Sequence, residues 1–251
     1  QNTQVKNIIK LNQKAKARRE QKLFVAEGRK MFQEAPENLI DRIYVAESML
    51  GDEEVMQKVR RFSWEAVENS VFRQMCDTQT PQGILAIVRM PKYDLPDLLQ
   101  GDHTHLLILE SVQDPGNLGT MVRTGEGAGI TGIIMNKTTV DLFNPKTIRS
   151  TMGSIYRVPY LITEHLPDLL DELHKENIRL YAAHLKGNTY YDAFDFTGAC
   201  GFLIGNEGNG LSDEIAERAD SYLKIPMEGK VESLNAAVSA ALLMYECKRQ
   251  R

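Results

Sequence analysis

The stretch HLLILESVQDPGNLGTMVRTGEGAGITGIIMN, residues 105–136, decides how the chain is expected to fold. The apolar run at 105–112 suits a buried strand, NLGTMVRTGEGAG (117–129) suits a helix, and GIIM (132–135) suits a second strand. From here to the C-terminus, continuous apolar strands alternate with amphipathic helices. This pattern predicts an α/β domain whose parallel sheet is covered on both faces. In such sheets ligands bind beyond the carboxyl ends of the strands.

The sequence before this stretch predicts a small, separate α/β domain. Helical patterns occupy residues 5–20, 29–35, 53–62 and 70–76, and strand patterns occupy residues 23–28, 40–48 and 80–90. The segment PKYDLPDLLQGDH (91–103) follows, with two prolines, one glycine and no clear period. We therefore expect a first domain at residues 1–92, a linker at 93–103 and a second domain at 104–251.

Charge is distributed unevenly along the chain, whose net charge is −4. Residues 1–92 hold 16 Lys and Arg against 12 Asp and Glu, whereas residues 93–251 hold 14 against 22. The first 30 residues alone have 9 basic and 2 acidic side chains. A basic arm of this kind suits binding to a phosphate backbone, but a solvated chain terminus has the same composition.

The cysteines and histidines do not indicate a metal site. Cys76, Cys200 and Cys247 are far apart in the sequence, odd in number and free of CxxC spacing, which fits neither a zinc site nor a disulfide framework. His103 and His105 flank one Thr before an apolar run and are expected at a loop or strand edge. We therefore expect no metal, and a reducing cytoplasm is the simplest compartment.

Membrane insertion and secretion are not indicated by the sequence. It has no apolar run of about 18 residues, the length that a membrane span needs. The first residues, QNTQVKNIIK, lack the apolar core of a signal peptide.

The loop DPGNLGTMVRT (114–124) is the first of three that can carry chemistry. Asn117 stands where a helix N-cap is expected, and capping is its simplest role. Arg123 lies six residues further on, among Thr, Gly and Ala. It is either a solvated surface charge or a cation that the small neighbouring residues allow a ligand to approach. A dinucleotide fingerprint is excluded, because Ile130 replaces its third glycine.

The second loop is GFLIGNEGNGLSDE (201–214), in which an apolar strand leads into Gly205, Glu207 and two further glycines before a helix capped by Ser212. A plain turn needs one glycine, so three within six positions indicate a tightly bent backbone that lies close to another group. The loop has no GK[ST] sequence, which disfavours ATP or GTP hydrolysis and an unrelated nucleotide-binding protein.

The third loop opens the segment IPMEGKVESLNAAVSAALLMYE (225–246). Ser233, Leu234 and Asn235 begin a long, Ala-rich helix, where Ser and Asn are ordinary caps. One face of this helix is apolar, and we expect it to pack: Leu234, Val238, Ala241, Leu242 and Tyr245. The alanines permit close helix approach, in a dimer or in the core.

In this order and spacing, DPGNLGTMVRT, LIGNEGNGLS and IPMEGKVESLNAAVSAALLMYE closely resemble the three motifs of the SpoU/TrmH family of RNA methyltransferases (the SPOUT superfamily). The resemblance covers residues 104–248. More loosely, FVAEGRKMFQEA (24–35) and TPQGILAIV (80–88) resemble the ribosomal-protein-like, RNA-binding domain of many members. The family resemblance implies a parallel-sheet α/β domain with a deep trefoil knot, which periodicity could not reveal.

The resemblance also implies the site residues. The positions that would line a pocket for S-adenosyl-L-methionine (AdoMet) are Gly205, Ile225, Met227 and Leu234, where the missing side chain of Gly205 lets the cofactor come close. The positions that match the polar active-site residues are Asn117, Arg123, Glu207, Ser233 and Asn235. Ser233 and Asn235 would position a ribose, and Glu207 would hold hydrogen-bond donors in place.

The family mechanism gives the activating role to Arg123. A guanidinium stays protonated at ordinary pH, so a grip on the RNA phosphate or ribose is physically easier for Arg123 than action as a general base. Both roles remain open.

The implied activity is transfer of a methyl group from AdoMet to a ribose 2′-hydroxyl of RNA, by a homodimer that completes the active site. Large-subunit ribosomal RNA is the first substrate candidate, because a separate basic domain suits structured RNA. Transfer RNA is the second. A non-catalytic RNA-binding or ribosome-assembly protein with this fold is the alternative, but all five polar positions are present.

Overall fold

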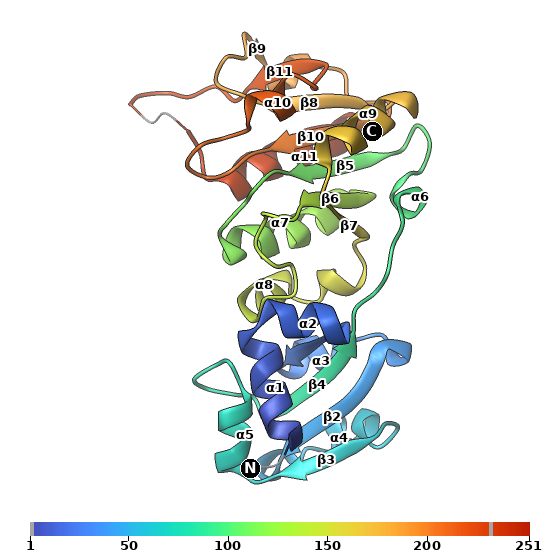
Figure 1. The fold of residues 1–251 in the computed structure, drawn as a ribbon, viewed down its shortest axis with the longest axis vertical. Helices are drawn as coiled ribbons and strands as arrows, with labels where there is room; N and C mark the ends of the chain where they lie inside the picture. Colours follow the sequence, from blue (N-terminus) through green and yellow to red (C-terminus); the bar gives the residue numbers. More distant parts are fainter. Residues whose placement is uncertain (1–2, 231–232) are drawn as a thin grey trace. The chain divides into compact units, whose positions relative to one another are not determined.

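The computed structural model describes residues 3–230 and 233–251, and the chain forms two compact units (Figure 1). The small unit comprises Gln1–Lys92 together with Asp141–Tyr156. The large unit comprises Tyr93–Val140 and Arg157–Arg251. The division expected from the sequence differs in two places, because the segment 93–103 belongs to the large unit and the segment 141–156 belongs to the small one.

The small unit has a four-stranded sheet in the order β1-β4-β2-β3, in which β4 is antiparallel to both neighbours and β3 is parallel to β2. The strands are β1 (Leu23–Glu27), β2 (Ile40–Ala46), β3 (Trp64–Val67) and β4 (Ile84–Arg89). The helices are α1 (Thr3–Gln13), α2 (Ala15–Gln21), α3 (Arg29–Glu34), α4 (Glu53–Val59), α5 (Asn69–Met75) and α8 (Pro145–Thr151), with short 3₁₀ turns at Glu37–Leu39, Glu47–Met49 and Ser154–Tyr156. Strand β3 was not predicted, because four half-exposed residues carry little periodic signal.

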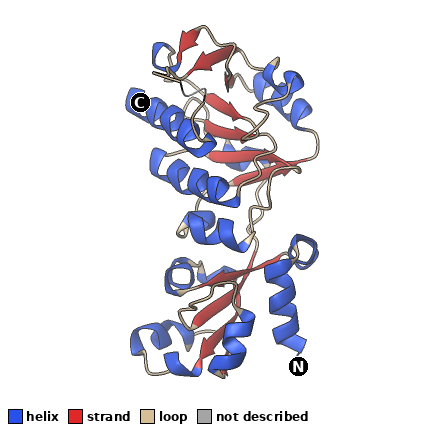
Figure 2. Ribbon diagram, turned by 90° about the vertical axis from the view of Figure 1, so that its left-hand side faces the viewer, coloured by secondary structure: helices blue, strands red, loops and turns tan. Residues whose placement is uncertain are grey.

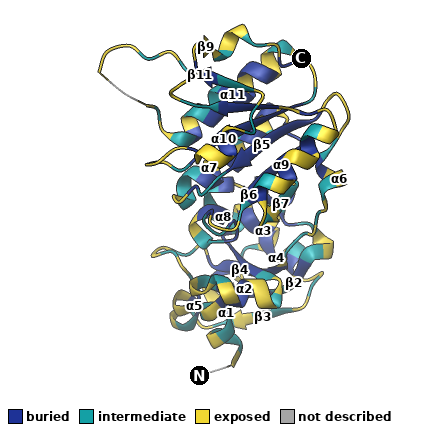
Figure 3. Ribbon diagram, turned by 45° about the horizontal axis from the view of Figure 1, so that its top comes forward, coloured by how far each residue is buried: buried dark blue, intermediate teal, exposed yellow. Residues whose placement is uncertain are grey.

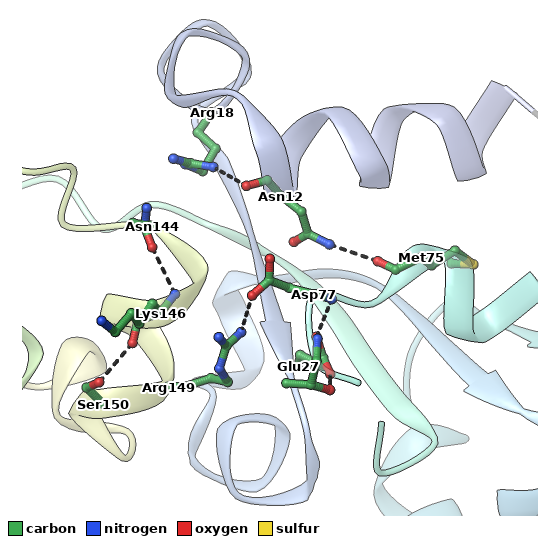
Figure 4. A network of polar contacts seen from close by, with 10 residues as sticks. Asn12, Arg18, Glu27, Met75, Asp77, Asn144, Lys146, Arg149 and Ser150 are labelled. Atoms are coloured by element: carbon green, nitrogen blue, oxygen red, sulfur yellow. Dashed lines mark hydrogen bonds and ion pairs between the residues drawn. The ribbon is translucent and has the colours of Figure 1, made fainter. Parts of the chain in front are cut away.

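The helix expected at residues 5–20 is two helices, because Lys14 between them has an extended backbone. Arg18 explains the break. Its Nη1 donates to the carbonyl oxygens of Leu11 (2.5 Å) and Asn12 (3.0 Å), at the end of α1 (Figure 4). Its Nε donates to Asp141 Oδ2 at 2.8 Å, and the side chain is only 3% exposed. Arg18 is therefore a structural cation, and the basic arm has one fewer charge available for RNA.

The segment 141–156 joins the small unit through buried contacts. The rings of Phe143 and Phe24 lie 4.9 Å apart, and the hydroxyl of Tyr156 donates to the Met31 carbonyl at 2.9 Å. These contacts are non-local, so a division of the chain by sequence alone cannot find them.

The large unit has a seven-stranded, fully parallel sheet in the order β7-β6-β5-β10-β8-β11-β9. The strands are β5 (His105–Leu109), β6 (Gly132–Asn136), β7 (Tyr160–Thr163), β8 (Arg179–Ala183), β9 (Thr189–Tyr190), β10 (Cys200–Ile204) and β11 (Ser221–Lys224). The helices are α6 (Leu95–Leu98), α7 (Pro115–Ala128), α9 (Leu166–Lys175), α10 (Asp213–Ala216) and α11 (Ala236–Gln250), with a 3₁₀ turn at Tyr191–Ala193. The α/β class and the parallel sheet predicted from the sequence are confirmed.

Helices cover both faces of this sheet (Figure 2). On one face, leucines of α9 pack with Leu106, Ile108 and Leu203. Leu98 of α6, in the expected linker, is fully buried in the same cluster and lies against Gly132, which has no room for a Cβ. On the other face α7 and α11 pack together and α11 contacts β10. The strands of both units are mostly buried (Figure 3).

The face of α11 that was expected to pack is largely open. Val238 and Tyr245 are each 47% exposed, whereas Ala240, Leu243 and Met244 on the adjoining face are buried. Within the single chain it is therefore the adjoining face of α11 that packs, and packing of the expected face, which a dimer would provide, stays a prediction.

The fold brings together Cys200 of β10 and Cys247 of α11, which are distant in the sequence. Both are free and buried, and their sulfurs are 3.7 Å apart.

Within the described residues, no helix is long and apolar enough to cross a membrane.

Candidate functional site

The three glycine- and asparagine-containing loops meet at the carboxyl ends of β5, β10 and β11. Asn117 on α7 donates from Nδ2 to Glu207 Oε1 (3.1 Å), and its Oδ1 accepts from Asn235 Nδ2 (2.9 Å). Each of these three residues comes from a different loop. The site is therefore assembled by side chains that are about 90 and 118 residues apart in the chain.

Asn117 is not the N-cap of α7, which corrects the expectation from the sequence. Asp114 caps the helix: its Oδ1 accepts from the backbone N–H of Asn117 at 2.7 Å. Pro115 occupies the first turn, where the absence of an N–H is tolerated. Because Asp114 caps, the side chain of Asn117 is free to link Glu207 and Asn235.

Glu207 sets the direction of this hydrogen-bond chain. Burial opposes ionisation of its carboxyl, but hydrogen bonds from the backbone N–H groups of Asp114 and Gln113 and from Asn117 outweigh that effect, so the pKa of Glu207 lies below its usual value. The backbone bonds are 3.0 and 2.9 Å long. An ionised carboxylate only accepts, so Asn117 must turn its amide nitrogen towards Glu207 and its oxygen towards Asn235.

Asn235 completes the chain and caps α11. Its Oδ1 accepts from the backbone N–H groups of Ala237 (2.8 Å) and Val238 (3.3 Å), while Nδ2 donates to Asn117. The capping role expected for this residue is confirmed, and the same side chain also joins α11 to α7. Among the described residues, the second N–H of the Asn235 amide has no partner and is available to a ligand.

The loop after β10 is shaped by contacts within the chain. A Cβ on Gly205 would overlap the backbone of Gly210 and Leu211. Asn206 braces the loop, since its Oδ1 accepts from the N–H groups of Gly208 (2.9 Å) and Asn209 (3.0 Å) and its Nδ2 donates to the Ser111 carbonyl (2.8 Å). Glycine is therefore needed at position 205 because the backbone of Gly210 and Leu211 packs directly against it. The expectation that the missing side chain serves only the approach of the cofactor was incomplete.

A cavity of about 300 Å³ opens beside this loop, between the segments that follow β8, β10 and β11 and the start of α11. Six of the nine predicted site residues line it: Gly205, Glu207, Ile225, Met227, Ser233 and Leu234. Asn117 adjoins it through its hydrogen bond to Glu207, and Asn235 is joined in turn to Asn117. The lining combines apolar residues such as Ile225, Met227 and Leu234 with a few polar ones such as Glu207 and Ser233, the usual composition of a small-molecule site.

Sequence reasoning missed part of this lining. His184 and Leu185, after β8, border the cavity, and the His184 ring stacks on Tyr222 with centroids 4.9 Å apart. Neither residue belongs to a glycine-rich loop, and only their place at the carboxyl end of a parallel strand could have indicated them.

Arg123 stands apart from the cavity. It lies on an exposed position of α7, and within the described residues its side chain has no hydrogen bond or ion pair with Glu207, Asn117 or Asn235. The structure therefore brings together eight of the nine predicted residues and leaves out the one given the activating role. In the same described part, no group of three or more His, Cys, Asp or Glu side chains could hold a metal ion.

Comparisons with known proteins cover nearly the whole chain. The model of the SpoU rRNA methylase family matches residues 104–245, and that of the MRM3-like substrate binding domain matches residues 2–86. A 23S rRNA (guanosine-2′-O)-methyltransferase of Bacillus subtilis, RlmP, is 32% identical over 98% of this chain and 96% of its own length.

Two solved structures extend this likeness to the fold. The SpoU methyltransferase AviRb from Streptomyces viridochromogenes has a TM-score of 0.90 at 26% identity, covering 100% of this chain and 98% of that one. An AdoMet-bound rRNA methyltransferase from Sinorhizobium meliloti has a TM-score of 0.87 at 30% identity, covering 99% and 95%. Each of these two proteins therefore contains counterparts of both units within a single chain.

Proposed function

Because this chain belongs to the SpoU rRNA methylase family, we propose that it transfers a methyl group from AdoMet to a ribose 2′-hydroxyl of large-subunit ribosomal RNA. The observation that carries the proposal is the convergence of three loops on one cavity through the chain Glu207–Asn117–Asn235. A hydrogen-bond chain that runs between three elements and ends at an ionised carboxylate is more than helix capping needs.

The cavity fits the cofactor in size and chemistry. Its volume of about 300 Å³ is at the lower end of the range for small-molecule pockets, roughly 300–1,000 Å³. Met227 and Leu234 offer apolar contact, and the loops around Gly205 and Ile225 border the same cavity, where their backbone could hydrogen-bond an adenine edge. AdoMet, when bound, supplies an electrophilic methyl group on a sulfonium. The residues that would hold it are Gly205, Ile225, Met227 and Leu234.

The polar residues have the task of placing the ribose. Ser233 lines the cavity, and Asn235 retains one N–H, so both can hold ribose hydroxyls near the cofactor pocket. Glu207 fixes Asn117, and Asn117 fixes Asn235, so the carboxylate acts by positioning. The 2′-oxygen gains a bond to the methyl carbon as the bond from that carbon to sulfur breaks, and the hydroxyl proton passes to solvent water. A cation close to the oxygen lowers the cost of the negative charge that develops.

Arg123 is the cation that we assign to this step, and a homodimer would bring it into place. In a single chain it contacts neither Glu207 nor Asn235 among the described residues. The open apolar face of α11, with Val238 and Tyr245, borders a hollow shared with Thr120 and Thr124 of α7, the helix that carries Arg123. If two chains pack through this face, the partner's Arg123 can reach the site.

Ribosomal RNA is preferred over transfer RNA as the substrate. RlmP, named for 23S rRNA, matches this chain over both units, including the one that matches a substrate binding domain. The small unit carries 18 Lys and Arg against 13 Asp and Glu, and this positive net charge favours binding to RNA. We place the activity in the cytoplasm, on the cysteine usage described above.

The test is transfer of labelled methyl from AdoMet to separated ribosomal and transfer RNA, with Arg123→Ala in parallel. We expect alkali-stable label in ribosomal RNA, a loss of about a hundredfold or more with Arg123→Ala, and unchanged AdoMet affinity by calorimetry. Label in transfer RNA alone would transfer the proposal to that substrate. Binding of AdoMet and of RNA without any label would support the non-catalytic alternative.

A further inference from the structure

The small unit contains a second hollow, which the proposed reaction does not use. Its volume is about 360 Å³, within the range of roughly 300–1,000 Å³ typical of ligand pockets. It lies between the end of β2, helix α5 and the loop that leads into β4. Five polar side chains line it: Ser48, Asn69, Arg73, Gln79 and Thr80.

The charge of this hollow favours an anion. Arg73 is its one charged side chain, and none of the described residues that line it is acidic. Arg73 is exposed, and within the described residues its guanidinium has no hydrogen bond or ion pair, in contrast to Arg29, Arg42, Arg60 and Arg61 of the same unit. A guanidinium has five N–H donors in a planar fork that matches phosphate oxygens.

The hollow also presents unused amide donors. Asn69 Oδ1 accepts from the Ser48 hydroxyl (2.8 Å) and the Ser48 backbone N–H (3.2 Å), which fixes the amide with its Nδ2 free among the described residues. In that same part of the chain, the side chains of Gln79 and Thr80 have no hydrogen bond. Four neighbouring groups thus keep donors for a ligand.

Hydrogen bonds hold the loop on both sides of Gln79 and Thr80, which form the rim of the hollow. Glu27, only 8% exposed, accepts from the backbone N–H groups of Asp77 (2.9 Å) and Thr78 (3.4 Å) and from the Thr78 hydroxyl (Figure 4). Asp77 in turn pairs with Arg149 at 2.6 Å. Further along, Gln82 Oε1 accepts from the Arg29 N–H at 2.8 Å. Anchors on both sides leave Gln79 and Thr80 as a fixed edge, which lowers the entropic cost of binding.

We propose that this hollow binds one unpaired nucleotide of the RNA substrate, with its phosphate on Arg73 and its base or ribose on the Asn69 amide. RNA is recognised largely through unstacked nucleotides whose edges are free for hydrogen bonds. The inference rests on the proposed function, because it assigns to the small unit a contact with the same RNA. It adds a specific subsite to the diffuse attraction that net charge provides.

Two substitutions test the hollow with little risk to the fold. Asn69→Asp keeps the oxygen that accepts from Ser48 but replaces the free donor with negative charge. Arg73→Ala removes a side chain without partners among the described residues. In the full-length protein, we expect each to raise the dissociation constant for fluorescent fragments of large-subunit ribosomal RNA by about tenfold. Arg73→Ala should also reduce the slope of log affinity against log salt by about one phosphate contact.

Arg60→Ala is the matched control. Arg60 is an exposed arginine of the same unit that pairs with Glu53 outside the hollow, so its loss changes the net charge equally. We expect it to weaken RNA binding less than about twofold. Equal losses in Arg60→Ala and Arg73→Ala would show diffuse attraction and overturn the proposal, as would unchanged affinity in both hollow variants.

Two further measurements separate this inference from the proposed function. AdoMet affinity should be identical in all variants, because the cofactor cavity lies in the large unit. If the wild-type protein bound no RNA, the proposed function would fail and the hollow with it. If free adenosine monophosphate bound more tightly than RNA and Asn69→Asp abolished this, the hollow would be a small-nucleotide site and its assignment to RNA would be wrong.

Discussion

The cavity of the large unit and the hollow of the small unit are built in opposite ways. The cavity lies along a glycine-containing loop, with Gly205 where the chain comes closest to itself, and Glu207 in its lining is held by a hydrogen-bond chain through Asn117 to Asn235. The hollow is made of side chains that keep their donors free, on a rim fixed from beneath. The first arrangement suits one cofactor in one pose, and the second suits a polymer that contributes one nucleotide.

This contrast explains why the two regions differ in what their sequences reveal. A backbone cavity needs glycine and asparagine at fixed positions, so it leaves motifs such as LIGNEGNGLS. A hollow of exposed side chains leaves Asn69, Arg73 and Thr80 scattered over ordinary helix and loop sequence. The two regions should therefore respond differently to substitution.

Gly205→Ala should have the largest effect. The new Cβ would collide with the backbone of Gly210 and Leu211, which cannot move without opening the loop. We expect loss of AdoMet binding by calorimetry and a destabilisation of about 3 kcal/mol or more by urea unfolding. Gly208→Ala is the control, because its nearest neighbour would be Asn206 Oδ1 at an ordinary 3.5 Å. Retention of AdoMet affinity in Gly205→Ala would contradict the backbone origin of the cavity.

Arg18→Ala should destabilise the small unit alone. It leaves the carbonyls of Leu11 and Asn12 without their donor and Asp141 without its cation. Loss of one partner from a buried ion pair costs about 3 kcal/mol. Thermal unfolding should show an earlier transition, while AdoMet affinity stays unchanged. Arg19→Ala, at an exposed neighbour, should change stability by less than about 0.5 kcal/mol. Weaker AdoMet binding in Arg18→Ala would contradict this, because it would show that the cofactor cavity depends on the stability of the small unit.

Lowering the pH should destabilise the large unit around Glu207, and this should be the smallest of the three effects. The pKa of Glu207 is lowered in the folded protein, so its ionisation stabilises the fold fully above the ordinary Glu pKa of about 4.3. That stabilisation is lost as the pH falls through the lowered value. Melting temperatures of wild type and Glu207→Gln should therefore differ near neutral pH and converge in acid. A constant difference down to about pH 3 would contradict ionisation of Glu207 in the folded state.

Particular residues show where sequence reasoning stopped. The pattern around Asn117 predicted a helix start correctly but assigned the cap to the wrong residue, because Asp114 and Asn117 are both good caps and only the backbone geometry distinguishes them. Periodicity identified α11 but did not show that Ala240, Leu243 and Met244 form its buried face within the chain. Cys200 and Cys247, separated in the chain, lie with sulfurs 3.7 Å apart. The cap is a local contact between residues three apart, whereas the packing of α11 and the approach of the two cysteines depend on contacts between distant segments.

The sequence by itself determined the α/β class, the parallel sheet, the family and the loops that bear the site, because periodicity and glycine placement are local consequences of backbone chemistry. Only the tertiary structure decided that Asn117 joins Glu207 to Asn235, that Arg18 is buried, and that residues 141–156 pack with the small unit. It also decided that Arg123 stands outside the cavity of its own chain. Those outcomes depend on which segments meet in space, and hydrogen bonds and burial between distant residues leave no period in the sequence.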